Sequence, residues 1–160
     1  MGFELYAVIG DRGVLGDLRH PTMHPMHPLH DGLGLCSVRT QVAMDEPDAP
    51  LPERVPRLTE SVLGYVRAIS ARTRVIYVAA EFYDGVGDQT ACGWADGELE
   101  LGPLHSHHNE VPSPARGLLR RPRETTGAID EALAWLGVER PRRTDRFARV
   151  GLSERYVWEP

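Results

Sequence analysis

Histidine is the residue type in this chain whose spacing most suggests metal chemistry. A neutral imidazole binds zinc, copper or nickel, and histidine-rich tracts often bind such ions. The first candidate ligands are His24, His27 and His30, in a segment where prolines recur every third or fourth residue. In polyproline II these imidazoles would share one edge, ~9 Å apart. Because metal–nitrogen bonds are ~2 Å long, two of them at most could bind one ion, with a further ligand from elsewhere.

The second group of candidate metal ligands is His105 and His107, within the sequence His-Ser-His-His-Asn-Glu. If this segment is extended, the two side chains lie on one face, and Glu110 could add an oxygen ligand. This pair is the better start for a metal site, and the prediction strengthens if the two histidine groups meet in space. Two alternatives stay open: polar surface loops without a metal, or a pH-responsive surface, since imidazoles titrate near pH ~6.5.

A third set of chemical groups surrounds a glycine-rich turn. Three carboxylates and an amide follow one another at Glu81, Asp84, Asp88 and Gln89, and we predict that they form a binding site. Gly85 and Gly87 can adopt positive φ, so the turn could present backbone N–H groups. Glu81 is the candidate catalytic residue, since partial burial on an apolar strand would raise its pKa and suit acid–base work. The alternative is a hairpin whose glycines serve only the turn.

The elements that must position these groups follow from apolar periodicity. Alternation and β-branched residues predict strands at Phe3–Ile9, Leu33–Val42, Arg74–Tyr83, Gln89–Ala95 and Glu98–Leu101. The last three form a β-meander over about 74–102. Its first strand is apolar on both faces, which predicts a central strand covered on both sides. Asp96-Gly97 predicts a tight hairpin.

Helices and loops complete the predicted domain. Apolar stripes predict amphipathic helices over about 58–71 and 124–136, the second ending at Gly137. Residues 13–19 suit a short helix or turn, residues 20–28 an extended or looped tract, and residues 45–56 a proline-rich surface loop or interface arm. The tail, residues 147–158, returns as a strand or lies along the surface. This order predicts an α+β class, with a mainly antiparallel sheet and packed helices in a single domain, 1–160.

Composition excludes several classes of function. A chain of 160 residues with net charge −5 offers no overall positive field for a phosphate backbone, so we expect no nucleic-acid partner. No apolar run reaches the ~20 residues of a membrane span, and the N-terminus does not read as a signal peptide. Cys36 and Cys92 are far apart and form no C-x-x-C motif. We therefore expect a cytoplasmic protein with reduced thiols.

The segment Glu81-Phe-Tyr-Asp-Gly-Val-Gly-Asp-Gln89, followed by Trp94, carries a family resemblance. It resembles small uncharacterised bacterial, in part actinobacterial, proteins in which an acidic residue, aromatics and G-x-G-x-Q lead into a strand ending in Trp. Such proteins are similar to the immunity partners of secreted toxins, which are small, acidic and non-catalytic. Where that family shows Gly-Gly, this chain has Asp84-Gly85. The resemblance implies a protein partner and assigns no catalytic residue.

Two functions of different class follow from these patterns. The first is a non-catalytic cytoplasmic binding protein, immunity-like, that acts by protein–protein interaction. The alternative is a metal-dependent enzyme that uses a divalent transition metal (Zn, Cu or Ni) held by the His20–His30 and His105–His108 groups. No nucleophile–base pair and no phosphate-binding glycine motif is visible in the sequence, which favours the first.

Overall fold

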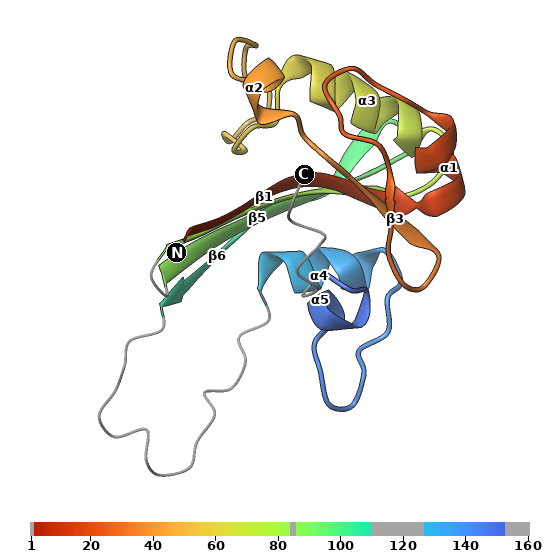
Figure 1. Cartoon of the computed structure of the whole chain (residues 1–160), viewed down its shortest axis with the longest axis vertical. Helices are drawn as coiled ribbons and strands as arrows, with labels where there is room; N and C mark the ends of the chain where they lie inside the picture. The colour runs from red at the N-terminus through yellow and green to blue at the C-terminus, as the bar shows by residue number, and fades with distance from the viewer. Residues whose placement is uncertain (1, 84–85, 110–126, 153–160) are drawn as a thin grey trace.

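The computed structural model describes residues 2–83, 86–109 and 127–152, and it is built on one six-stranded antiparallel sheet of order β2-β3-β1-β4-β5-β6 (Figure 1). The strands are β1 (Gly2–Asp11), β2 (His27–Pro28), β3 (Leu33–Ser37), β4 (Val75–Tyr83), β5 (Val86–Ala95) and β6 (Glu98–Asn109). The helices are α1 (Arg12–Asp17), α2 (Thr40–Ala43), α3 (Glu60–Ser70), α4 (Ala128–Trp135) and α5 (Arg146–Arg149). The predicted α+β class with an antiparallel sheet is confirmed.

The centre of the sheet is the pair β1–β4, which is apolar on both faces. β1 pairs with β3 on one side and β4 on the other, and β4-β5-β6 form the predicted meander. Side chains alternate along β4, with Tyr77 and Ala79 in one buried cluster and Ile76 and Val78 in the other. This double burial is the reason for the continuous apolar run in the sequence of β4.

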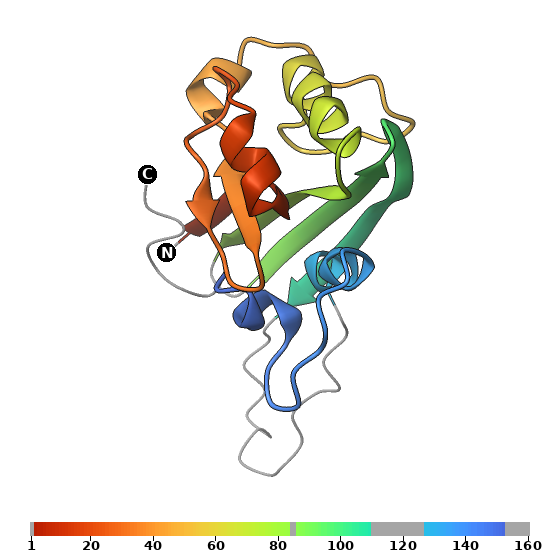
Figure 2. The same cartoon turned by 90° about the vertical axis from the view of Figure 1, so that its right-hand side faces the viewer.

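α3 covers one face of the sheet together with α1 and α2 (Figures 1 and 2). The hydroxyl of Thr59 accepts a hydrogen bond from the backbone N–H of Val62, which caps the helix N-terminus. Val62, Val66 and Ile69 are fully buried. Each such side chain contributes about 1.5–3 kcal/mol through removal from water, so helix periodicity was a reliable signal here.

α4 and α5 cover the opposite face of the sheet (Figure 1). Ile129 and Leu133 are fully buried, as their spacing predicted. Gly137 has φ +95°, and Val138 and Gly137 donate backbone hydrogen bonds to Leu133 and Ala134. This is a Schellman ending, in which a glycine takes the left-handed position after the helix.

A buried ion pair joins α5 to α4. The Asp130 side chain is 8% exposed, and it accepts hydrogen bonds from the Arg146 backbone N–H at 2.8 Å and from the Arg146 guanidinium at 2.9 Å. Arg146 also donates from Nε to the carbonyl of Val138 at 2.7 Å. The start of α5 therefore depends on one carboxylate of α4.

Several predicted boundaries are corrected by the structure. The strand predicted over Leu33–Val42 ends at Ser37. Val38 still donates to the Tyr6 carbonyl of β1, but the N–H of Arg39 donates to the Thr22 carbonyl, and α2 begins at Thr40. β6 extends to Asn109 rather than Leu101, so the meander covers 75–109. α4 begins at Ala128, while 124–126 lie outside the described residues. In the tail, 146–149 form α5 instead of a strand, capped by the Asp145 carboxylate, and 153–158 lie outside the described residues.

Gly87 belongs to strand β5, not to the predicted turn. It lies opposite Phe82 of β4, and a Cβ added at Gly87 would lie 2.6 Å from Phe82 Cγ and closer still to the ring edge. The absence of a side chain therefore makes room for the aromatic ring across the strand pair. Asp96 and Gly97 do form the predicted tight hairpin, with φ of 50° and 81°.

The histidine–proline tract turns at residues 21–22, where the N–H of Met23 donates to the His20 carbonyl, and then lies along the β3 edge of the sheet, in keeping with the predicted extended or looped chain. Met23 bridges Val38, and His27 pairs with Leu35 in the short strand β2. His20 lies against the Tyr65 ring, and its Nδ1 is 2.6 Å from the Thr22 hydroxyl. Among the described residues, no helix is long and apolar enough to cross a membrane.

Candidate functional site

A row of charged side chains crosses one face of the sheet at a single level. Glu4 of β1 is opposite Glu81 of β4, Glu81 is opposite Asp88 of β5, and Asp88 is opposite His107 of β6. Because opposite residues of antiparallel strands project to the same side, all four lie on the α3 face. Neighbouring strands are ~4.8 Å apart, so three carboxylates occupy a strip only ~10 Å wide.

Two tyrosines form hydrogen bonds with the first two carboxylates, each reaching from one strand to the other. The Tyr6 hydroxyl donates to Glu81 Oε1, and the Tyr83 hydroxyl donates to Glu4 Oε1. The two contacts are mirror copies because the same pattern, Glu-x-Tyr, occurs in β1 and in β4, and antiparallel pairing sets each tyrosine diagonal to the other strand's glutamate. Burial, the hydrogen bond to Glu81 and the charge of both glutamates raise the pKa of Tyr6 far above its ordinary value. Tyr6 therefore keeps its proton and acts as a donor.

A second row of side chains lies nearer to α3, two residues further along the strands. Thr90 of β5 is opposite His105 of β6, and the Thr90 hydroxyl is 3.1 Å from His105 Nδ1. The other imidazole nitrogen, Nε2, is 2.9 Å from the carboxylate of Glu53, which belongs to the loop between α2 and α3. In the first row, His107 Nδ1 is 2.6 Å from Asp88. Each of these two histidines therefore has a carboxylate partner from another part of the chain.

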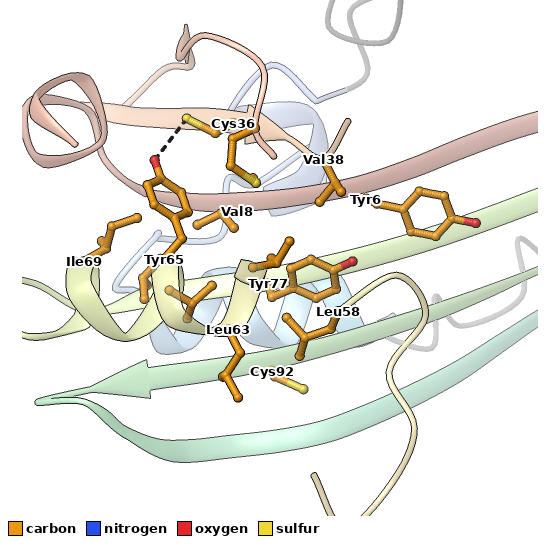
Figure 3. Close-up of a cluster of buried hydrophobic side chains, with 14 of the residues drawn as sticks. Tyr6, Val8, Cys36, Val38, Leu58, Leu63, Tyr65, Ile69, Tyr77 and Cys92 are labelled. Atoms are coloured by element: carbon orange, nitrogen blue, oxygen red, sulfur yellow. Dashed lines mark hydrogen bonds between the residues drawn. The ribbon is translucent and has the colours of Figure 1, made fainter. Parts of the chain in front are cut away.

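The loop over residues 45–58 forms the border between this polar region and the core beneath α3. The buried Tyr77 donates from its hydroxyl to the carbonyl of Pro56 at 2.7 Å, and the guanidinium of Arg57 lies over the Tyr6 ring. Figure 3 shows Tyr6 at the margin of the apolar cluster, with its hydroxyl directed away from Val8 and Tyr65. The core therefore ends at Tyr6 and Tyr77, and polar side chains continue along the strands.

We call this region the polar sheet face. It consists of the side chains that share the α3 side of the sheet beyond the core, namely Glu4, Tyr6, Glu81, Tyr83, Asp88, Thr90, His105 and His107. The strands that carry it project beyond α3 and α4 (Figure 1). Its outer members are open to solvent: the side chains of Asp88 and His107 are 73% and 57% exposed, and Tyr83 is 49% exposed.

The predicted binding residues separate into three groups. Glu81 and Asp88 are brought together, because β5 begins at Val86 and places Asp88 on the strand opposite Glu81. Asp84 lies outside the described residues. Gln89 does not join Glu81 and Asp88. It projects to the opposite face, and its Oε1 accepts a hydrogen bond from the backbone N–H of Ile129 at 3.2 Å. It caps α4, which has no cap from its own Gly127, and Ser106 helps by accepting from Ala128.

The two predicted histidine groups do not meet. His24, His27 and His30 lie along or beside β2, whereas His105 and His107 lie on β6, at the other edge of the sheet. Five inter-strand spacings separate β2 from β6, about 24 Å, so no single ion can contact both groups. In the described parts of the chain, no three His, Cys, Asp or Glu side chains are arranged to hold a metal ion. Glu110 lies outside these parts.

No family model, curated protein or solved structure matches the chain. The resemblance to immunity proteins stays a prediction.

Sequence reasoning missed Glu4, Tyr6, Tyr83 and Glu53. A signal for the first three was present in the repeated Glu-x-Tyr of the first strand and the central strand, Glu4-Leu-Tyr6 and Glu81-Phe-Tyr83. Its meaning requires the register, which pairs Glu4 with Glu81. Glu53 had no local signal, because its contact with His105 spans 52 residues of sequence.

Proposed function

We propose that this protein is a non-catalytic, cytoplasmic binding protein that acts by protein–protein interaction through the polar sheet face. The observation that carries the proposal is the duplicated Glu-x-Tyr pattern, which sets carboxylates and tyrosine rings side by side on two central strands. Tyrosine is enriched at protein interfaces because one side chain offers apolar area and a hydrogen bond. Strands also hold such groups in fixed positions, which lowers the entropy lost on binding.

The chemistry of the polar sheet face fits recognition better than turnover. Tyr6 holds its proton, so it provides no base, and its hydroxyl is already used by Glu81. Cys36 and Cys92 are both free but buried, and burial raises the pKa of each thiol. A thiol of raised pKa is a poor nucleophile, and two free thiols suit a reducing compartment.

An immunity-like role is consistent with this surface and with the net charge of −5. Such a protein would block its partner by covering it, and the partner would be encoded by a neighbouring gene.

Site-specific photocrosslinking in the source cells tests the proposal. A photoreactive residue replaces Val86, which is 43% exposed at the outer end of the polar sheet face. The matched control carries the same residue at the exposed position Glu131 on α4, which covers the opposite face. A defined protein adduct from position 86 and none from position 131 supports the proposal. No adduct at position 86, or the same adducts from both positions, overturns it.

A further inference from the structure

We infer that the partner contacts the polar sheet face with an extended, arginine-bearing segment of its chain. This inference rests on the proposed function, because it names the chemistry of the surface that the partner presents. It begins from the arrangement of charge on three neighbouring strands, Glu4, Glu81 and Asp88.

Like charges directly opposite on paired strands destabilise a sheet. Glu4 and Glu81 are such a pair, and so are Glu81 and Asp88. The protein compensates in part with hydroxyl donors and with His107 at the end of the row. Within the described residues no arginine forms an ion pair with Glu4 or Glu81, and Arg57 lies over the Tyr6 ring instead. The strip therefore keeps an excess of negative charge that a cationic partner can neutralise.

The unused oxygens define which cation fits. Tyr6 and Tyr83 each donate to an Oε1 atom, and within the residues that the structure describes no hydrogen bond reaches Oε2 of Glu81 or of Glu4, so these two oxygens can accept from a partner. Two carboxylates one strand apart suit the planar guanidinium group, which offers five N–H donors in a fixed fork. Lysine would bring a single compact charge with three donors and match this pair less well.

An apolar pair beside the strip, two residues further out along β4 and β5, indicates the rest of the segment. Tyr83 and Val86 are opposite each other, on the same face as Glu81 and Asp88, and are 49% and 43% exposed. A segment that lies across the strip would thus meet carboxylates at its middle and an apolar contact at its end. An extended chain with arginine and an apolar residue two positions apart carries both side chains on one face and so presents both chemistries to the strip.

The test uses a labelled dodecapeptide of three Arg-Ser-Val-Ser repeats, whose arginines and valines share one face of an extended chain. A peptide of equal length with glutamate in place of arginine is the opposite-charge probe. Binding is measured by fluorescence anisotropy at low salt, because exposed charge interactions weaken beyond ~10 Å at about 0.1 M salt. The main variant is Glu4→Gln with Glu81→Gln and Asp88→Asn. Its matched control, of identical net charge, changes the exposed Glu98, Glu100 and Glu139 to Gln. The single change Asp88→Asn, at an exposed side chain, is a second variant that does not threaten the fold.

We expect the arginine peptide to bind, the triple variant to lose affinity by about tenfold or more, and the control to bind as the parent does. Asp88→Asn alone should weaken binding severalfold. Equal losses in the triple variant and its control, binding of the glutamate peptide, or no binding of the arginine peptide would overturn the inference. If crosslinking from position 86 still yields a partner, the proposed function stands and only the arginine chemistry falls. If both experiments fail, both proposals fall.

Discussion

Replacing Gly87 with alanine should destabilise the protein, although alanine is normally the better strand residue. The reason is the Phe82 ring, which packs across the strand pair onto the bare Cα of Gly87. An added methyl would lie 2.6 Å from Phe82 Cγ, well inside van der Waals contact. The strand backbones are held by β1 on one side and β6 on the other, so the ring must move.

The size of the effect follows from what the ring loses. A phenylalanine that is fully buried removes about 150–250 Å² from water, and Phe82 is partly buried against the α4 side of the sheet. Exposing about 100 Å² of it again would cost ~2.5 kcal/mol at ~25 cal/mol per Å². Alanine returns about 0.5–1 kcal/mol by restricting the unfolded chain. The net loss in the free energy of unfolding is therefore about 1.5–2 kcal/mol.

Urea denaturation of four proteins checks the reasoning: the parent, Gly87→Ala, Phe82→Ala and the double variant. In the Phe82→Ala background the steric conflict is absent, so Gly87→Ala should become stabilising by about 0.5–1 kcal/mol. This change of sign is the decisive result, and the double-mutant cycle should give a coupling of about 2–3 kcal/mol. A Gly87→Ala effect of the same sign and size in both backgrounds would refute the packing explanation and return Gly87 to a purely backbone role.

Two further predictions concern the core and the thiols. Asp130→Ala removes the carboxylate that binds Arg146, whose side chain is only 19% exposed, and should lower the free energy of unfolding in urea by about 3 kcal/mol. The matched change Asp48→Ala breaks an ion pair with Arg54 in which both side chains are exposed, and should lower it by under ~1 kcal/mol. Equal losses from the two changes would contradict the buried-pair interpretation. Burial, with a smaller contribution from Glu53, raises the pKa of Cys92 from 9.0 to about 12. The unfolded chain therefore releases this proton at lower pH than the folded protein does. The free energy of unfolding should keep its full value below pH 9 and fall as the pH rises from 9 toward 12. Burial also raises the pKa values of Tyr65 and Tyr77, which act in the same direction at slightly higher pH. Cys92→Ala should make the free energy of unfolding fall less steeply with pH. A urea midpoint that stays constant across this pH range would exclude a contribution from the buried thiol.

The sequence was most informative where a residue's neighbours along the chain determine its environment. The stripe of α3, the Schellman glycine after α4 and the Asp96-Gly97 hairpin are all local patterns, and the structure contains each of them. Strand ends were less predictable. The segment after Ser37 continues a β-like composition, and Val38 still bonds β1, yet from Arg39 onward the backbone bonds Thr22 and then the turns of α2.

The candidate site depended on register, which no local pattern supplies. The sequence predicts Glu81 and Asp88 as site residues, but as parts of a turn rather than as opposite members of a hairpin. The sequence places Gln89 in the same site, but the period of two along a strand directs it to the other face, where it caps α4. Glu4 became visible only once β1 was placed beside β4, since the two glutamates are 77 positions apart in the chain and opposite in the sheet.

The position of β1 between β3 and β4 also has a consequence for synthesis on the ribosome. β1 leaves the exit tunnel well before β4, and β3 can pair only with its second half, from Ala7 to Asp11. Until Tyr83 has emerged, the other edge of an apolar strand stays open, and open apolar edges invite pairing with other chains. We expect nascent chains that stop before Val75 to depend on chaperones, and chains that extend past Asn109, with the meander complete, to be released from them. Ribosome-bound chains of graded length, assayed for chaperone association, would show this as a step rather than a gradual decline.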